Sequence, residues 1–237
     1  MAAGSCFERY ELKYLLDAEQ YRAVRSAMEG RTVPDAYGRS RICNLYFDTP
    51  DFRIIRRSIE KPVYKEKLRL RSYGPVGCNG MLFVELKKKY RSVVYKRRVT
   101  MTREDAQSFF RDPQPAGQIE REIAYFLDVY PGVRPAVWIS YAREAFFGAA
   151  DPDFRITFDT DILARWDDLT LSGGIYGSPV LPAGKTLMEV KVAGALPLWL
   201  VACFSQSGIR QTSFSKYGTA YLQKQQDQTM IGGQHYA

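Results

Sequence analysis

Histidine is almost missing from this sequence. The 237 residues include one histidine, His235, which is the third residue from the C-terminal end. A metal site built on histidines and a catalytic dyad that depends on histidine are therefore excluded. The chemistry of the chain must come from its other polar residues.

Cysteine pairs and long apolar runs are also lacking. The cysteines lie at positions 6, 43, 78 and 203, and no two have the C-x-x-C spacing of zinc knuckles or thioredoxin motifs. No run approaches the roughly 18–20 apolar residues of a membrane span, and the first residues build no apolar signal-peptide core. We therefore expect reduced thiols, no membrane span and a cytoplasmic location.

Positive charge is what the chain has in excess. Lys and Arg number 34 against 26 Asp and Glu, for a formal net charge of +8. Such a chain favours an anionic partner, which could be nucleic acid, lipid headgroups, polyphosphate or a nucleotide. A basic helix or tail would favour nucleic acid or a membrane, but here the charge lies in predicted strands.

The strands are predicted from a period of two residues. In residues 64–73, Lys65, Lys67, Arg69 and Arg71 share one face, and apolar residues occupy most of the other face. The same alternation recurs in residues 7–16, 81–89, 90–101, 136–147, 154–160 and 187–192. Each charged face alone could be a solvated surface of an antiparallel sheet. Because the pattern recurs from strand to strand, we favour a closed sheet with helices outside and cations lining a common lumen.

A lumen lined by cations needs counter-charge. Self-repulsion and desolvation would oppose folding unless a polyanion or counterions filled it. A chain of phosphates meets this need, since Arg makes bidentate contacts and Lys supplies point charges. The few carboxylates among the cations could neutralise a neighbouring Arg or bind a divalent metal together with phosphate oxygens. Glu189 is the first candidate ligand, then Glu11 and then Glu85.

Helices and loops are predicted from capping residues and composition. Asp17, with Gln20 closing a capping box, starts a helix at about residues 18–29, and another helix follows near 118–129. The Gly- and Pro-rich segment 167–185 is predicted to be mobile, either as a lid or as a solvated insert. We expect a single domain over residues 1–222 and a polar C-terminal tail over 223–237.

Nine short motifs follow one another along the chain: RYELKYLL, NLYFDT, KLRLRSY, FVELKKK, YKRR, SYAREAF, FRITFDTDI, LMEVKV and FSKYG. Together they resemble the VTC domain, and the resemblance runs from about residue 7 to residue 222. This is the polyphosphate-polymerase branch of the triphosphate tunnel metalloenzymes, which are related to the CYTH proteins. The resemblance implies an α+β fold, an antiparallel eight-stranded β-barrel with helices packed outside.

The resemblance also implies the site residues. The phosphate-binding residues would be Lys13, Arg69, Arg71, Lys87, Lys96, Arg143, Arg155 and Lys216. Four residues would take part in catalysis: Lys216, Ser215, Arg71 and Lys87. Glu189 and Glu11 would bind Mn²⁺ or Mg²⁺.

The implied activity is transfer of the γ-phosphate of ATP onto a growing polyphosphate chain. CYTH proteins begin with E-x-E-x-K, whereas this chain has Arg9 in place of the first Glu, followed by Glu11 and Lys13. The loss of one carboxylate favours transfer to an anionic acceptor over hydrolysis, because hydrolysis commonly needs a carboxylate to activate water. Hydrolysis of tripolyphosphate or nucleotides and a non-catalytic polyphosphate- or inositol-phosphate-binding module remain alternatives.

The expected ligands are ATP, triphosphate and polyphosphate. Nucleic acid is disfavoured, since no RNA-binding signature accompanies the tyrosines that lie among the basic residues. Any membrane attachment, at the inner face, would require a separate membrane-protein partner.

Overall fold

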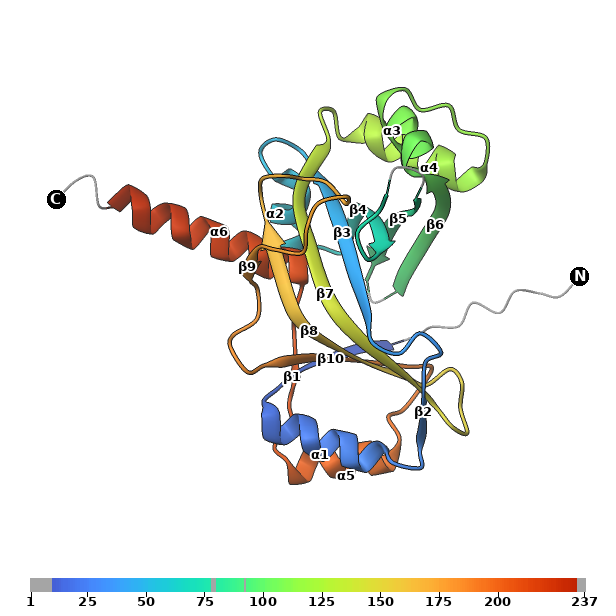
Figure 1. Ribbon diagram of the computed structural model, residues 1–237, viewed down its shortest axis with the longest axis vertical. Helices are drawn as coiled ribbons and strands as arrows, with labels where there is room; N and C mark the ends of the chain where they lie inside the picture. Colours follow the sequence, from blue (N-terminus) through green and yellow to red (C-terminus); the bar gives the residue numbers. More distant parts are fainter. Residues whose placement is uncertain (1–9, 78–79, 92, 234–237) are drawn as a thin grey trace, which may run out of the picture. The chain divides into compact units, whose positions relative to one another are not determined.

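Eight long strands form most of the sheet, and all of them except β3 carry the charged alternation that the sequence predicts. The computed structural model describes residues 10–77, 80–91 and 93–233 (Figure 1). The long strands are β1 (Tyr10–Leu16), β3 (Ser40–Asp48), β4 (Tyr64–Tyr73), β5 (Met81–Tyr90), β6 (Val93–Thr102), β7 (Arg134–Gly148), β8 (Arg155–Arg165) and β10 (Thr186–Val192). Three short strands are added to them: β2 (Thr32–Pro34), β9 (Ser178–Pro179) and β11 (Gln211–Thr212). The helices are α1 (Ala18–Met28), α2 (Arg53–Ile59), α3 (Arg103–Arg111), α4 (Gln118–Val129), α5 (Leu198–Gln206) and α6 (Lys216–Gly233).

Two compact units divide these elements. Of the described residues, the first unit contains 10–40, 142–161 and 181–214, and the second contains 41–141, 162–180 and 215–233. Strands β7 and β8 contribute residues to both units. Each unit has its own apolar core and is described by itself below.

In the first unit, the sheet pairs in the order β11, β1, β10, β8 and β7. Its apolar face packs against α1 and α5 around residues such as Val24, Phe158 and Met188. Helix α1 begins as predicted, because Asp17 accepts a hydrogen bond from the backbone N–H of Gln20 and the Gln20 side chain accepts one from Asp17 N–H. The opposite face of the sheet carries the charged side chains.

In the second unit, the order is β7, β3, β4, β5 and β6, with β9 paired to β8. Helices α3 and α4 cover the apolar face of the sheet, where Leu68, Val84, Ile123 and Phe126 are buried together. The predicted helix at 118–129 is confirmed by the bounds of α4. Because Leu68 and Leu70 are in this core, their neighbours Lys67, Arg69 and Arg71 lie on the other face.

The eight-stranded barrel of the prediction is not confirmed. The structure has an eleven-stranded sheet whose pairing order ends at β11 and β6, and no pairing between these two strands closes it within the described residues. The three additional strands are only two or three residues long, too short for an alternating pattern to reveal. The α+β class and the antiparallel pairing of the strands with a defined register are confirmed.

Helix α6 continues through most of the predicted tail. It starts at Lys216 and ends at Gly233, so it passes the boundary predicted after Leu222. No helix among the described residues is both long enough and apolar enough to cross a bilayer.

The glycine-rich segment after β8 is organised by one buried arginine. The Arg165 guanidinium donates hydrogen bonds to the carbonyl groups of Asp168, Thr170 and Gly174, over 3.0–3.1 Å. It also lies 3.8 Å from the centre of the Trp138 ring. The part of the predicted loop near residues 168–176 is therefore held against the end of β8 rather than projecting as a free lid.

Replacing Arg165 by Lys should lower the free energy of unfolding by about 1–3 kcal/mol. Lysine keeps the charge, but it lacks the planar guanidinium group, which donates hydrogen bonds to several carbonyl groups at once. Urea unfolding measures the change, with the exposed Arg121→Lys on α4 as the control. Equal stabilities of the two variants would show that the guanidinium contacts contribute nothing.

Candidate functional site

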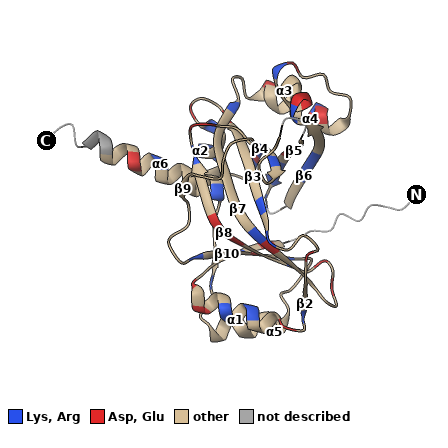
Figure 2. Cartoon of the chain, viewed as in Figure 1, with Lys and Arg blue, Asp and Glu red and all other residues tan. Residues whose placement is uncertain are grey.

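The predicted site residues fall into two clusters, one in each unit. Figure 2 shows Lys and Arg along the strands together with a smaller number of acidic residues. The first unit brings together Glu11, Lys13, Arg143, Arg155 and Glu189 on β1, β7, β8 and β10. The second unit holds Arg69, Arg71, Lys87 and Lys96 on β4, β5 and β6, and Ser215 and Lys216 where α6 begins. Arg9, on which the departure from the CYTH motif rests, lies outside the described residues.

In the first cluster, Lys13 lies between two carboxylates. Its Nζ is 3.3 Å from Glu11 Oε1 and 3.5 Å from Glu189 Oε1, and it donates a hydrogen bond to the carbonyl of Phe214 at 3.0 Å. The β1–β10 register fixes this arrangement, since Lys13 is directly opposite Glu189. The two predicted metal ligands thus flank the same positive charge.

Arg143 connects Glu189 to a carboxylate that the sequence reasoning did not select. Its Nε and Nη2 donate to the two oxygens of Asp159 at 2.6 Å, and Nη2 also donates to Glu189 Oε2 at 3.2 Å. Asp159 is fully buried. Its position on the face shared with Arg155 was the available signal, but the pattern of one strand does not show which arginine lies opposite.

Arg155 and Lys191 complete the first cluster. Arg155 Nη2 is 3.4 Å from Asp35 Oδ2, and Lys191 Nζ is 4.0 Å from Glu11 Oε2. Burial lowers the pKa of Lys191, although the carboxylates of Glu11 and Glu189 act against this. The cluster therefore alternates cations with carboxylates rather than presenting cations alone.

The donor set of this cluster fits an oxygen-preferring metal that takes most of its ligands from phosphate and water. Glu11 and Glu189 provide carboxylate oxygens, which Mg²⁺ and Mn²⁺ prefer. The buried hydroxyl of Thr157, opposite Glu189 in the β8–β10 pair, has no hydrogen-bond partner among the described residues. No group of three or more His, Cys, Asp or Glu suited to a metal occurs in the described ranges, so a cage built from the protein alone is not formed there.

The second cluster gathers four cations around one carboxylate. Glu85 is 1% exposed and lies 2.7 Å from Arg69 Nη2, 2.7 Å from Lys96 Nζ and 3.7 Å from Arg71 Nε. The guanidinium of Arg98 also contacts it. Burial alone would raise the pKa of Glu85, but Arg69, Arg71 and Lys96 hold that pKa well below its ordinary value. The neutralising role, one of the two alternatives for such carboxylates, accounts for Glu85.

Lysines lie directly opposite one another in this cluster. The registers of β4, β5 and β6 align Lys67 with Lys87 and Lys87 with Lys96. Directly opposite side chains in adjacent strands have Cβ atoms about 4.5–5.5 Å apart, and like charges there are destabilising. The next row, Arg69–Glu85–Arg98, has one carboxylate between two guanidinium groups. This surplus of positive charge suits a bound polyanion.

Side chains of β3 and β7 hold the two arginines of β4. Arg69 Nη1 donates to the hydroxyl of Tyr46 at 2.8 Å. Arg71 donates to Asn44 Oδ1 at 3.0 Å and to the hydroxyl of Tyr141 at 3.2 Å. Asn44 and Tyr141 are buried, which fixes the direction of the guanidinium group. The sequence reasoning assigned no site role to these three residues, because their partners depend on strand pairing.

The start of α6 lies close to these basic strands. Lys67 Nζ donates to Ser215 Oγ at 3.0 Å, and the same oxygen accepts the backbone N–H of Gly218 at 3.1 Å, which caps the helix. Lys216 is only 9% exposed, and its Nζ lies 4.5 Å from the centre of the Tyr141 ring. Tyr141 is thus in contact with both Lys216 and Arg71. An ordinary solvated lysine at this position is excluded.

Lys96 gives the second cluster a titratable cation. Burial, opposed in part by the charge of Glu85, lowers its pKa from 10.5 to about 8. The folded protein therefore releases this proton at a lower pH than the unfolded chain does, and the contribution of Lys96 to stability rises with pH between about 8 and 10.5.

A bound triphosphate should raise the pKa of Lys96 and draw a proton from solvent. Between about pH 8 and 10 we expect proton uptake on binding, with affinity falling as pH rises. Calorimetry at pH 8.5 in two buffers of different ionisation enthalpy measures the uptake, and Lys96→Met is the control because it removes the titrating group. The same uptake by this variant and by the unaltered protein would contradict the assignment.

Comparison with known proteins gives these clusters a family context. A model of the VTC domain matches residues 8–224. The chain belongs to the VTC domain family. The match includes every predicted site residue, so the resemblance predicted from the nine motifs is confirmed. No curated protein matches this VTC domain.

Two solved structures are similar to this chain at low sequence identity. A candidate adenylate cyclase from Bacillus halodurans has a TM-score of 0.53 and 14% identity, covering 88% of this chain and 95% of that one. A candidate adenylate cyclase from Vibrio parahaemolyticus has a TM-score of 0.46 and 13% identity, covering 90% of this chain and 98% of that one. At such identities the likeness to the first protein concerns the fold alone.

Proposed function

We propose that this VTC domain is a metal-dependent phosphotransferase that forms inorganic polyphosphate from the γ-phosphate of ATP. The observation that carries the proposal is the row of opposed lysines, Lys67, Lys87 and Lys96, beside the Arg69–Glu85–Arg98 row. One buried carboxylate serves four cations in this cluster, and a chain of phosphates supplies the missing negative charge.

Phosphoryl transfer depends on positioning and charge neutralisation. The bond between the γ-phosphorus and the β–γ bridging oxygen breaks, and a terminal oxygen of the acceptor polyphosphate bonds to the γ-phosphorus. ADP leaves and the polymer gains one phosphate, with no net proton change for fully ionised species. In this proposal Arg69, Arg71, Lys87 and Lys96 bind phosphate oxygens, and Lys216 acts at the transferring group.

The first cluster, taken by itself, holds proposed phosphate-binding groups and the proposed metal ligands. Lys13, Arg143 and Arg155 bind phosphate oxygens, while Glu189 and Glu11 bind Mn²⁺ or Mg²⁺. When bound, the metal neutralises charge that develops on phosphate oxygens. Arg143 holds Glu189 in place through the contact at 3.2 Å.

The low pKa of Glu85 favours transfer over hydrolysis. A general base must have a pKa near the working pH, and a carboxylate held well below its ordinary pKa by guanidinium groups is a weak base. An anionic phosphate acceptor needs no such base. Hydrolysis of tripolyphosphate or nucleotides remains the second candidate, because Glu11 is partly exposed beside Lys13 and could orient a water molecule.

Purified protein incubated with ATP and Mn²⁺ distinguishes the candidates. Polymer that stains on a gel supports the transferase, and orthophosphate alone supports the hydrolase. If neither product forms, the result supports a non-catalytic phosphate-binding module. Polyphosphate of defined length, added as a primer, tests whether transfer requires an acceptor.

Replacing Glu189 by Gln should reduce metal-dependent turnover at least about tenfold and raise the Mn²⁺ concentration needed for half-maximal rate. The amide keeps the size of the side chain but loses the charge that attracts the metal. Glu144→Gln is the matched control, since Glu144 lies in the same unit and pairs with Arg25 at 3.0 Å. An unchanged Mn²⁺ requirement in the Glu189 variant would remove this residue from the metal site.

A further inference from the structure

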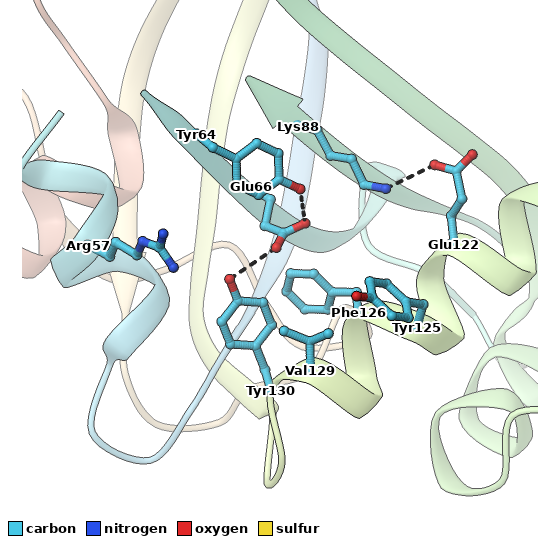
Figure 3. A pocket seen from close by; sticks show the side chains of 9 residues that line it. All are labelled: Arg57, Tyr64, Glu66, Lys88, Glu122, Tyr125, Phe126, Val129 and Tyr130. Atoms are coloured by element: carbon cyan, nitrogen blue, oxygen red, sulfur yellow. Dashed lines mark hydrogen bonds and ion pairs between the residues drawn. The ribbon is translucent and has the colours of Figure 1, made fainter. Parts of the chain in front are cut away.

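A cavity of about 260 Å³ lies in the second unit, on the side of β4 that faces away from the basic rows. Strand β4 places Glu66 on the face opposite to Lys65 and Lys67, and the wall across from it comes from α4 (Figure 3). The cavity contains none of the residues assigned to phosphate binding. Its chemistry is therefore separate from that of the two clusters.

A carboxylate held by two phenols forms one wall. Tyr64 donates its hydroxyl to Glu66 Oε2 at 2.8 Å, and Tyr130 donates to Glu66 Oε1 at 3.0 Å. Figure 3 shows both hydroxyl groups directed at the carboxylate. An ionised carboxylate can accept about four hydrogen bonds, so these two phenols leave acceptor capacity. No Lys or Arg of the described chain forms an ion pair with Glu66.

The two phenols beside Glu66 keep their protons at neutral pH. Burial first, and then the hydrogen bond and charge of Glu66, raise the pKa of Tyr64; the same causes raise the pKa of Tyr130 to about 12. Both phenols therefore remain donors at neutral pH.

Aromatic rings make up much of the remaining wall. Tyr125 and Phe126 of α4 line the cavity beside the two phenols, and the ring centres of Phe126 and Tyr130 are 4.8 Å apart. Ring faces attract cations, and a carboxylate supplies the counter-charge. An anion would be repelled by Glu66, and a purely apolar ligand would leave that carboxylate without a charged partner.

The other charged residues at the cavity do not satisfy Glu66. Lys88 Nζ is 3.1 Å from Glu122 Oε2, and Arg97 Nε is 3.2 Å from Glu122 Oε1, so both cations pair with Glu122 rather than with Glu66. Arg57, on α2, is exposed at the opposite side of the cavity and forms no ion pair with a described carboxylate (Figure 3). The positive charge of Arg57 repels a bound cation, so a ligand of this cavity can carry little positive charge.

We propose that this cavity binds a small organic ammonium ion, with Glu66 as its counter-ion and the rings of Tyr64, Tyr125, Phe126 and Tyr130 around it. The proposal does not depend on polyphosphate synthesis. A site for a cation on a chain with a net charge of +8 also requires local negative charge, and Glu66 provides it.

Choline and its uncharged isostere 3,3-dimethyl-1-butanol test the proposal by calorimetry at constant ionic strength. The two probes have the same shape and differ in charge. We expect saturable binding of choline and at least about tenfold weaker binding of the alcohol. Equal affinity for both probes would show an ordinary apolar pocket, and no saturable binding of choline would show that Glu66 only ties α4 to β4.

Substitutions of residues that line the cavity test whether choline binds there. Glu66→Gln should weaken choline binding at least about tenfold, because a charged contact is lost. Glu122→Gln is the matched control, since its carboxylate is already paired with Lys88 and Arg97. Arg57→Ala should tighten binding by removing a like charge. Equal losses from Glu66→Gln and Glu122→Gln would contradict the assignment; if Glu66→Gln does not fold, the probe comparison and Arg57→Ala decide it.

Discussion

Replacing Glu85 by Gln is expected to lower the free energy of unfolding by about 3–5 kcal/mol, because the cations around it, of which Arg71 is itself buried, lose the one buried carboxylate that offsets their charge. Glu85 is 1% exposed and is contacted by Arg69, Arg98 and Lys96. The amide can still accept hydrogen bonds from them, but it no longer offsets their repulsion. Chemical denaturation followed by circular dichroism measures the loss.

A control variant, and stabilisation by an added anion, test whether the loss of stability is specific to Glu85. Glu122→Gln removes a carboxylate from a half-exposed ion pair with Lys88 and Arg97, where about 0–1 kcal/mol is expected. Tripolyphosphate at about 100 times its Kd should stabilise a folded protein by about 2.7 kcal/mol, and it should restore much of what the Glu85 variant loses. Sulfate at the same ionic strength should do less. Similar losses in the two variants, or equal rescue by both anions, would contradict the view that these cations form a polyanion site.

The alternation of residues predicted which side chains share a face, and it did so in both units. A period of two placed Lys67, Arg69 and Arg71 opposite Leu68 and Leu70, and the structure buries the leucines in the core. The capping box at Asp17 was equally informative, because its partners lie within four residues. Such local signals need no knowledge of how distant strands pair.

The contacts of several site residues depend on the strand register, which the sequence did not show. Whether Glu85 binds a metal or neutralises arginines depends on the residues opposite it in β4 and β6. Asp159, Asn44 and Tyr141 owe their roles to partners that are between 16 and 95 residues away in the chain. A single strand pattern carries no information about such neighbours. The alternation of residues also could not show whether the sheet closes into a barrel, because strands of open and closed sheets alternate in the same way.

The burial of Lys216 is another feature that only tertiary contacts explain. A lysine in the first turn of a helix is usually solvated, yet this one is covered and lies over the ring of Tyr141. Asp48 helps to fix the helix start, because its carboxylate accepts hydrogen bonds from Ile54 N–H on α2 and from the hydroxyl of Tyr217. The start of α6 is therefore held in place before any ligand binds.

Replacing Lys216 by Met is expected to lower kcat of the proposed transfer about 100-fold while KM for ATP changes by less than about threefold. Methionine keeps most of the side-chain length, so the buried site is filled while the charge is lost. Helix starts attract anions through their free backbone N–H groups, and Lys216 adds a fixed positive charge at that point. A group that meets charge developing on the transferring phosphoryl stabilises the transition state more than bound ATP, which lowers kcat rather than raising KM.

Lys224→Met is the matched control for this experiment, because it removes a lysine from the same helix. Its Nζ lies 4.3 Å from the centre of the Trp166 ring, so the control also loses a cation that contacts an aromatic ring. Initial rates of polymer formation across an ATP titration with Mn²⁺ give both kinetic constants, and thermal melting verifies that each variant is folded. A Lys216 variant with unchanged kcat, or with a change in KM alone, would make Lys216 a ground-state contact. A loss of kcat in the Lys216 variant alone would instead place the reacting phosphate at the first turn of α6, since a general loss of helix charge would affect both variants.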